Sequence, residues 1–279
     1  MKSSLELIKE LRERTNASLM DCKKALQNTN NNIEEAILWL RKHGITKAQA
    51  KSVRSNNEGL IKTLIKENKA IILELNSETD FVSRNEQFIN LFDKIAIILL
   101  DEEPNSIEEA LNLLHSQQTI SDLLNEATYK LGEKITISRF NLLKKTDDES
   151  WAFYNYQTGR IATLLKLQGK VKPEIANQIA LQIIVKKPIF ITNEDVCEKF
   201  INQELEVINA QINNELESKR INIQSVEKIR QGRLKKQLDE VVLLNQGLYS
   251  NEKQSFESFL TENNTKVLIM YRYEIGVLN

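Results

Sequence analysis

The sequence is poor in the residues that carry most catalytic chemistry and tight turns. Its 279 residues include two histidines, two cysteines, eight glycines and three prolines. It lacks both glycine-rich phosphate-binding patterns, G-x-x-x-x-G-K-[ST] and G-x-G-x-x-G, and with so few glycines it is poorly suited to cradle a nucleotide of its own. It also lacks H-E-x-x-H and any pair of Cys or His at metal-binding spacing. We therefore expect no cofactor, no metal site and no enzymatic activity.

The few cysteines and histidines do not suggest a catalytic group. Cys22 and Cys197 lie far apart among helix-forming residues, and neither has a histidine nearby. This usage predicts packed thiols in a reducing compartment rather than a disulfide. His43 and His115 adjoin predicted helix ends, where capping or exposure to solvent is the ordinary role. We expect a cytoplasmic protein.

Neither charge nor hydropathy favours nucleic acid or a membrane as a partner. The chain has 38 basic and 39 acidic residues, a net charge of -1, so no overall field attracts phosphate backbones or anionic lipids. The most apolar run, residues 95–100, is far shorter than the roughly 18 to 20 residues that span a bilayer. The start of the chain has no secretory signal pattern. We expect neither direct nucleic-acid binding nor membrane binding.

Residues 1 to about 45 predict three short helices in a compact bundle. Ser18 can cap the second helix and Asn32 the third, where Glu35 completes a capping-box pattern and Gly44 can end the helix in the left-handed conformation. Each helix has an apolar stripe for the core: Leu5, Ile8 and Leu11; Leu19, Cys22 and Leu26; Ile33, Ala36, Ile37 and Leu40.

The following segment changes from helical to strand periodicity. Residues 59–76 predict a β-hairpin, and Ser83 with Glu86 matches the S-x-x-E capping box of a helix packed on that hairpin. A second helix over about 119–131 and a returning strand over 134–143 follow. The helix that begins near Glu86 carries an apolar face of Phe88, Leu91, Phe92, Ile95 and Leu99.

The same order of elements recurs later in the chain. Residues 151–168 predict another hairpin, a helix opens at Pro173, and residues 265–276 predict another late strand. We therefore predict an α+β fold in which two related subdomains with antiparallel sheets follow the three-helix bundle. The predicted domains are residues 1–54, the bundle and its linker, then 55–145 and 146–279.

The second subdomain carries a polar insertion at about 194–243. Two apolar stripes at helical spacing run through it: Ile201, Leu205, Ile208, Ile212 and Leu216, then Ile223, Val226, Ile229, Leu234 and Leu238. The stripes predict an antiparallel coiled-coil hairpin that projects from the domain. The alternative is a pair of ordinary surface helices that lie back on the domain.

The stretch ELNSETDFVSR, residues 74–84, places carboxylates and a lone aromatic side chain between a strand and a helix. Glu78 and Asp80 could form an acid/base pair or hold a metal, but no third ligand accompanies them. Phe81 is either a core aromatic residue that anchors the hairpin to the next helix or a side chain presented to a partner. These residues alone do not decide between the two roles.

Two long motifs resemble the signatures of one family. ELNSETDFVSR, residues 74–84, is similar to the core signature of bacterial elongation factor Ts, and LRERTNASLMDCKKAL, residues 11–26, resembles the N-terminal signature of that family. Weaker similarities occur at four further stretches: GLIKT from 59, GRIATLL from 159, KKPIF from 186 and GRLKK from 232. The resemblance therefore covers nearly the whole chain.

The resemblance implies a guanine-nucleotide exchange factor that binds elongation factor Tu in its GDP-bound and nucleotide-free forms. It implies that the N-terminal bundle is ubiquitin-associated-like. It also implies that the Thr79, Asp80, Phe81 and Val82 turn disturbs the Mg²⁺ site of the partner, with Phe81 as a wedge. The resemblance further implies partner contacts for five residues of the N-terminal signature: Leu11, Arg12, Thr15, Met20 and Lys23.

Two features depart from the family pattern. Many members have a histidine where this chain has Gln157, which leaves one partner contact open. The chain ends at EIGVLN, without a C-terminal helical module that some members carry. A binding module without exchange activity is the alternative function, and an uncharacterised hydrolase is a more distant one because no catalytic group is evident.

Overall fold

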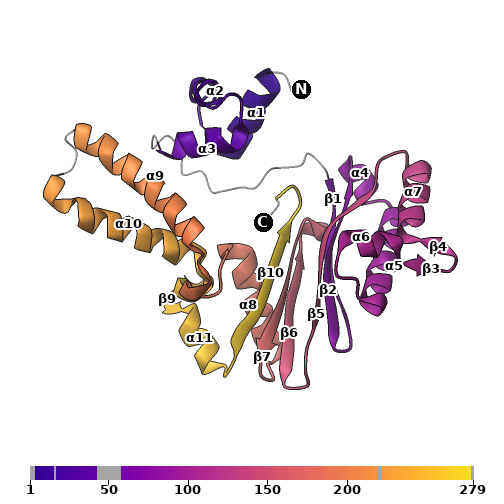
Figure 1. Cartoon of the computed structure of the whole chain (residues 1–279). Helices are drawn as coiled ribbons and strands as arrows, with labels where there is room; N and C mark the ends of the chain where they lie inside the picture. The colour runs from indigo at the N-terminus through magenta and orange to yellow at the C-terminus, as the bar shows by residue number, and fades with distance from the viewer. Residues whose placement is uncertain (1–3, 16, 43–57, 219–221, 278–279) are drawn as a thin grey trace. The chain divides into compact units, whose positions relative to one another are not determined.

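The computed structural model describes residues 4–15, 17–42, 58–218 and 222–277. The chain divides into two units, one of residues 1–53 with 192–242 and the other of residues 54–191 with 243–279 (Figure 1). The α+β class predicted from the sequence is confirmed, because helices combine with antiparallel sheets. Within the described residues, no helix is both long and apolar enough to cross a membrane.

The first unit begins with three helices, α1 (Ser4–Thr15), α2 (Leu19–Asn28) and α3 (Ile33–Lys42). They enclose a core that includes Leu11, Cys22, Leu26, Ala36 and Leu40. The predicted N-caps are confirmed: Ser18 accepts a hydrogen bond from the backbone of Asp21, and Asn32 accepts from Glu34 and Glu35. The ubiquitin-associated-like identity of this bundle stays a prediction.

The cap of α3 and the two cysteines differ in part from the sequence predictions. The Glu35 carboxylate accepts from the Asn32 side chain at 3.0 Å rather than from its backbone, so the capping box is incomplete. Cys22 is buried as predicted, but Cys197 is exposed at the N-cap of a later helix, so the expectation of two packed thiols is wrong for Cys197. Gly44 and His43 lie outside the described residues.

The first unit also contains the insertion, which forms α9 (Glu198–Glu217) and α10 (Val226–Val241). The short helix η2 (Asn193–Asp195) precedes α9, and η3 (Ile223–Ser225) precedes α10. The two long helices run antiparallel (Figure 1). Polar pairs join them, since Arg233 contacts Glu215 at 2.7 Å. Ile223 is 75% exposed and precedes α10, so its predicted place in the apolar stripe is wrong. The coiled-coil geometry stays a prediction.

The second unit begins with an antiparallel sheet of three strands, β1 (Glu58–Lys66), β2 (Lys69–Ser77) and β5 (Thr136–Lys144), in the order β1-β2-β5. β1 and β2 form the predicted hairpin, in whose turn Glu67 has a φ of 55°. Glu58 pairs with Ser77, so the start of β1 and the end of β2 lie side by side.

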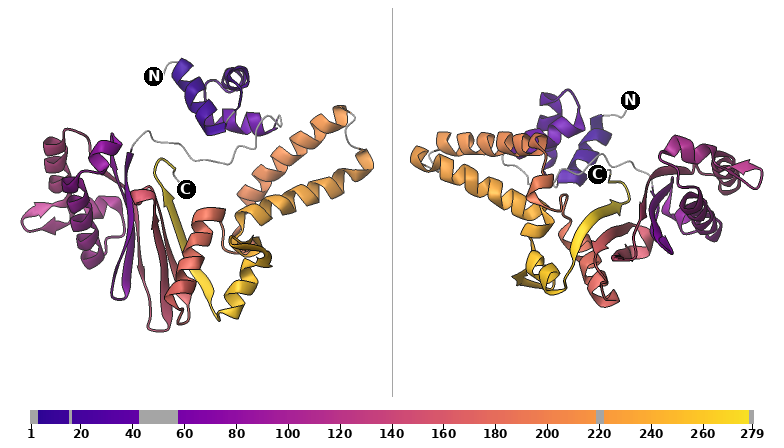
Figure 2. Two further views of the ribbon diagram at one scale, coloured as in Figure 1. Left: turned by 180° about the vertical axis from the view of Figure 1, so that it is seen from behind. Right: turned by 60° about the horizontal axis from the view of Figure 1, so that its bottom comes forward.

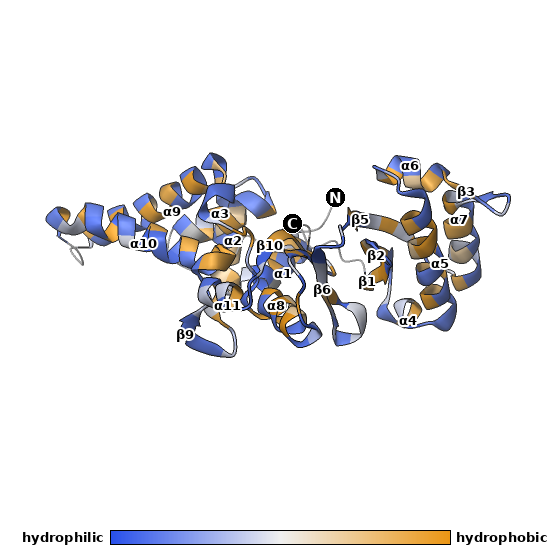
Figure 3. Cartoon of the chain, turned by 90° about the horizontal axis from the view of Figure 1, so that it is seen from below, coloured by the Kyte–Doolittle hydropathy of each residue, from blue (hydrophilic) through white to orange (hydrophobic). Residues whose placement is uncertain are grey.

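Helices cover the outer face of this sheet. They are α4 (Asp80–Ser83), α5 (Glu86–Glu102), α6 (Ile107–Asn112) and α7 (Ile120–Leu131), with a small hairpin of β3 (Leu114–His115) and β4 (Gln118–Thr119). Phe88 and Phe92 of α5 are fully buried against the strands. Figure 3 shows the hydrophobic residues along α5 and α7. This helical cover forms because α5 and α7 each present an apolar stripe toward the sheet.

The predicted capping box of Ser83 and Glu86 is wrong. Ser83 is the last residue of α4, and its hydroxyl donates to the carbonyl of Asp80 at 3.1 Å. Asn85 caps α5 instead and accepts a hydrogen bond from the backbone of Gln87 at 2.8 Å. The sequence pattern misled because Asn85 is also a favoured cap and lies directly before the helix.

The second sheet repeats the arrangement with β6 (Glu149–Tyr156), β7 (Ile161–Gln168) and β10 (Lys266–Glu274), in the order β10-β7-β6. Its outer face is covered by α8 (Pro173–Lys186) and α11 (Phe256–Glu262). Between β6 and β7 lies the turn η1 (Gln157–Gly159), and before α11 come η4 (Leu243–Asn245), β8 (Gly247–Leu248) and β9 (Asn251–Ser255). The predicted recurrence of hairpin, helix and late strand is confirmed.

The two sheets pack face to face. Their shared core contains Ile61 and Ile72 from one sheet and Leu164 and Tyr273 from the other. The Arg139 guanidinium lies 4.1 Å from the centre of the Tyr273 ring. The second unit is therefore layered as helices, sheet, sheet, helices (Figures 1 and 2).

Candidate partner-binding site

Phe81 is presented to solvent on α4, which begins directly after β2. Its side chain is 83% exposed, whereas the next residue, Val82, packs against the core of the first sheet. The four-residue helix therefore has an anchored side and an open side. Of the two roles left open by the sequence, the structure excludes a core position for Phe81.

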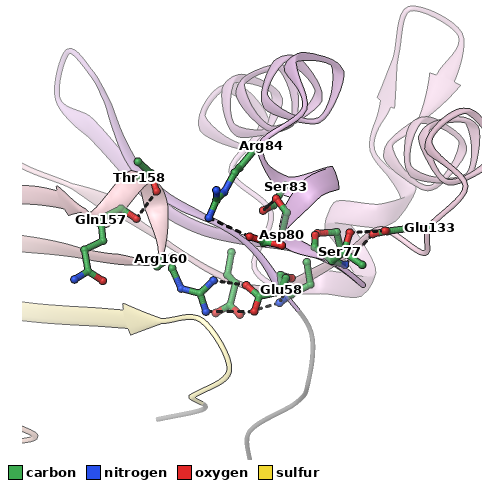
Figure 4. Close-up of polar contacts among 12 residues, drawn as sticks. Glu58, Ser77, Asp80, Ser83, Arg84, Glu133, Gln157, Thr158 and Arg160 are labelled. Atoms are coloured by element: carbon green, nitrogen blue, oxygen red, sulfur yellow. Dashed lines mark hydrogen bonds and ion pairs between the residues drawn. The ribbon is translucent and has the colours of Figure 1, made fainter.

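Hydrogen bonds close the turn of residues 79–84 that contains α4, called the α4 turn below. The backbone N–H of Ser83 donates to Thr79 at 3.4 Å, and that of Arg84 donates to Asp80 at 3.2 Å. The hydroxyl of Ser77 also donates to the carbonyl of Thr79, at 2.9 Å. Asp80 and Arg84 form an ion pair at 3.0 Å (Figure 4). Since Arg84 is largely exposed, this pair contributes at most about 1 kcal/mol to the turn.

The loop after α7 also holds the α4 turn, through the side chain of Glu133. The Glu133 carboxylate accepts hydrogen bonds from the backbone N–H groups of Glu78 and Thr79, at 3.1 and 2.9 Å. It also accepts from the Thr79 hydroxyl, at 2.5 Å. In return, the Glu78 carboxylate accepts from the backbone N–H of Lys134 at 3.2 Å. Side chains of Ser77, at the end of β2, and of Glu133, in the loop after α7, thus hold the segment that leads into α4 (Figure 4).

The second subdomain contributes the η1 turn to the same region. Gln157, Thr158 and Gly159 have φ angles of 49°, 52° and 88°, so three successive residues are left-handed. Arg160, which follows them, forms an ion pair with Glu58 at the start of β1. Because Glu58 is paired with Ser77, the η1 turn and the α4 turn lie near the same end of the β1–β2 hairpin (Figure 4). Gln157 is exposed there.

The five candidate residues of the N-terminal bundle separate into two groups. Leu11 is fully buried, and Thr15 is 6% exposed with its hydroxyl donating to the Leu11 carbonyl at 2.7 Å. Arg12, Met20 and Lys23 are exposed, Met20 to 70%. Leu11 and Thr15 therefore pack the bundle, while the other three side chains lie on its surface.

The carboxylates near Phe81 already have structural partners. Glu78 accepts from Lys134 and Asp80 pairs with Arg84, so neither points to acid/base chemistry. No group of three or more His, Cys, Asp or Glu residues is placed to hold a metal ion within the part of the chain that the structure describes. His115 lies exposed in β3. The site is suited to binding through shape and an exposed ring.

Sequence reasoning missed Glu133 and Arg160, the two residues that brace this site from elsewhere. Glu133 contacts Thr79 across 54 residues of sequence, and Arg160 contacts Glu58 across 102. The only local signal in the sequence was the glycine at position 132. It ends α7 with a φ of 74°, and the loop that carries Glu133 follows it.

Comparisons with known proteins match nearly the whole chain. The family model described as Elongation factor TS matches residues 78–277. Elongation factor Ts of Spiroplasma citri is 39% identical over 276 residues, which cover 99% of this chain and 93% of that protein. Elongation factor Ts of Phytoplasma australiense is 38% identical over 276 residues, 99% of each chain. The chain therefore belongs to the elongation factor Ts family, the guanine-nucleotide exchange factors of translation elongation.

Proposed function

We propose that this protein binds the GDP form of elongation factor Tu, the partner that its family implies, and releases GDP by inserting Phe81 beside the Mg²⁺ site of that partner. The observation that carries the proposal is the 83% exposure of Phe81 on a turn that is otherwise tightly held. Thr79, Asp80 and Val82 form the rest of the inserted turn.

The exposed ring provides the driving force. Burying a phenylalanine side chain contributes roughly 1.5 to 3 kcal/mol. The hydrogen bonds of Glu133 and Ser77 hold the turn before the partner arrives, so little conformational entropy is lost on binding. The gain is realised only when the partner opens a pocket for the ring.

The metal site of the partner explains why a small displacement is sufficient. Mg²⁺ demands near-ideal octahedral geometry and bridges protein and nucleotide phosphates. The bound cation is also the largest local charge at such a site. Moving its ligands therefore removes a concentrated electrostatic stabilisation of GDP.

Thermodynamic linkage converts binding into exchange. If this protein weakens the affinity for GDP by some factor, GDP weakens the affinity for this protein by the same factor. The complex then favours the nucleotide-free form of the partner, and GTP binding displaces the factor. No covalent bond is made or broken, so the protein needs no catalytic side chain.

We propose that other parts of the chain add contact area. Arg12, Met20 and Lys23 form a surface of the bundle, which we take as a ubiquitin-associated-like module that contacts the nucleotide domain of the partner. The α9–α10 hairpin, taken as a coiled coil, and the second subdomain provide further contacts. The residue ranges 1–54, 55–145 and 146–279 are the proposed domains.

The direct test is the release of fluorescent GDP from elongation factor Tu. Addition of this protein should accelerate release, and unlabelled GTP should then dissociate the complex. Binding without acceleration would instead identify a binding module, and absence of both would reject the assigned partner.

A further inference from the structure

We infer that Glu133 is a positioning residue for nucleotide exchange, because it fixes the turn that presents Phe81. The inference rests on the proposed function and assigns a role to a loop that no sequence motif includes. Glu133 itself does not need to contact the partner.

The contacts of Glu133 are concentrated on the residues that lead into α4. One carboxylate oxygen accepts from the backbone N–H groups of both Glu78 and Thr79, and the other accepts from the Thr79 hydroxyl. The Thr79 side chain makes no capping bond to α4, since its hydroxyl is engaged by Glu133. The carboxylate thus connects the loop to both the backbone and the side chain of one short segment.

The loop that carries Glu133 is itself well anchored. Gly132 ends α7 with a left-handed φ of 74°, and its N–H donates to the Thr128 carbonyl at 2.9 Å. On the other side, Ile135 is buried and its N–H donates to the Thr128 hydroxyl at 3.1 Å. In addition, the backbone N–H of Lys134 donates to the Glu78 carboxylate, so the two segments bond to each other in both directions. A carboxylate held in this way can hold the α4 turn in one orientation.

A charged acceptor is suited to this task. Hydrogen bonds to charged groups stabilise a fold more than hydrogen bonds between neutral groups do. Removal of the carboxylate should let the segment from Ser77 to Asp80 sample several orientations while the core behind it stays packed. Phe81 would remain exposed, but only a fraction of molecules would present it correctly, which lowers the apparent affinity by that fraction.

The test compares Glu133→Ala and Glu133→Gln in the full-length chain. We expect Glu133→Ala to slow factor-stimulated GDP release about tenfold, the equivalent of one such charged hydrogen bond. Glu133→Gln should recover part of the rate, because its amide oxygen can accept from the two backbone N–H groups. Glu126→Ala, which removes an exposed ion pair with Lys130 on α7, should keep the wild-type rate.

Hydrogen exchange gives a readout that does not depend on the partner. The amides of Glu78 and Thr79 should exchange faster in Glu133→Ala and regain protection in Glu133→Gln, with the amides of α5 unchanged. Unchanged protection of Glu78 and Thr79 in Glu133→Ala would overturn the inference.

A double-mutant cycle separates positioning from general destabilisation. If Glu133 acts through Phe81, then Glu133→Ala should have no further effect on release in a Phe81→Ala background. Additive losses in that background would contradict the inference. If wild type accelerates release and Glu133→Ala matches it, the inference fails while the proposed function stands; if wild type gives no acceleration, the proposed function itself fails.

Discussion

The side-chain amide of Asn155 on β6 pairs with both backbone groups of Thr63 on β1. Its oxygen accepts from the Thr63 N–H at 2.8 Å, and its nitrogen donates to the Thr63 carbonyl at 3.3 Å. β1 is an edge strand of its sheet, so these backbone groups have no strand partner on that side. One side chain therefore joins the two sheets and satisfies the backbone groups of Thr63 at the edge of β1.

This contact predicts a loss of stability in Asn155→Ala. The variant leaves a buried N–H and a carbonyl of Thr63 without their partner, which should lower the free energy of unfolding by about 1 to 3 kcal/mol. Chemical denaturation of both proteins measures the difference. Asn177→Ala on the exposed surface of α8 is the control, and equal stability of the two variants would contradict the account.

Gly159 in the η1 turn predicts a loss of stability when a methyl group is added at this position. Its φ is +88°, and a Cβ there would lie 2.1 Å from the Leu60 side chain and 3.2 Å from the Ile61 carbonyl. Gly159→Ala should therefore combine backbone strain of roughly 1 to 2 kcal/mol with a clash against β1.

Gly132 gives a matched control for the Gly159 substitution. Its φ is +74°, but no atom lies within 4 Å of the position that a Cβ would occupy. Gly132→Ala should show the strain alone, so thermal unfolding should place Gly159→Ala below Gly132→Ala. The reverse order would exclude the close packing of η1 on β1.

Glu103 at the end of α5 predicts a dependence of stability on pH. Hydrogen bonds from Lys144 and Lys69 hold the pKa of its carboxyl below the ordinary value, and Lys69 lies 2.5 Å away. Because the pKa is lower in the folded state, the stabilisation is present above the unfolded pKa and is lost as pH falls through the folded pKa.

The Glu103→Gln variant checks this dependence. Its deficit in free energy of unfolding relative to wild type should be full near neutral pH and should shrink as pH falls from roughly 5 to roughly 3. Denaturation at a series of pH values measures it, with Glu108→Gln on α6 as the control. A deficit that does not change with pH would show that the charge of Glu103 does not contribute.

Local patterns predicted the elements of this fold, whereas the contacts between distant segments could not be predicted. The strand signals in residues 59–76 and the cap at Ser18 depend on neighbours in sequence, and the hairpin and the cap were both confirmed. The Ser83–Glu86 capping box failed because two adjacent polar residues compete for one helix start, and sequence does not decide between them.

For the same reason, the sequence predicted the motif of the candidate site but not its exposure or its distant contacts. The motif at Thr79–Val82 was evident, but the pattern left Phe81 either in the core or on the surface. Its 83% exposure depends on where the β1–β2 hairpin and α5 place the short helix. The braces Glu133 and Arg160 act across 54 and 102 residues, a separation at which no periodicity carries information.

The most direct measurement is the rate of fluorescent GDP release from elongation factor Tu in the presence of Phe81→Ala. Tyr129→Ala is the matched control, since Tyr129 is an aromatic residue of α7 that is 90% exposed. Phe81→Ala should slow stimulated release by about thirtyfold, equivalent to about 2 kcal/mol, while Tyr129→Ala keeps the wild-type rate. Release by Phe81→Ala at the wild-type rate would contradict the account.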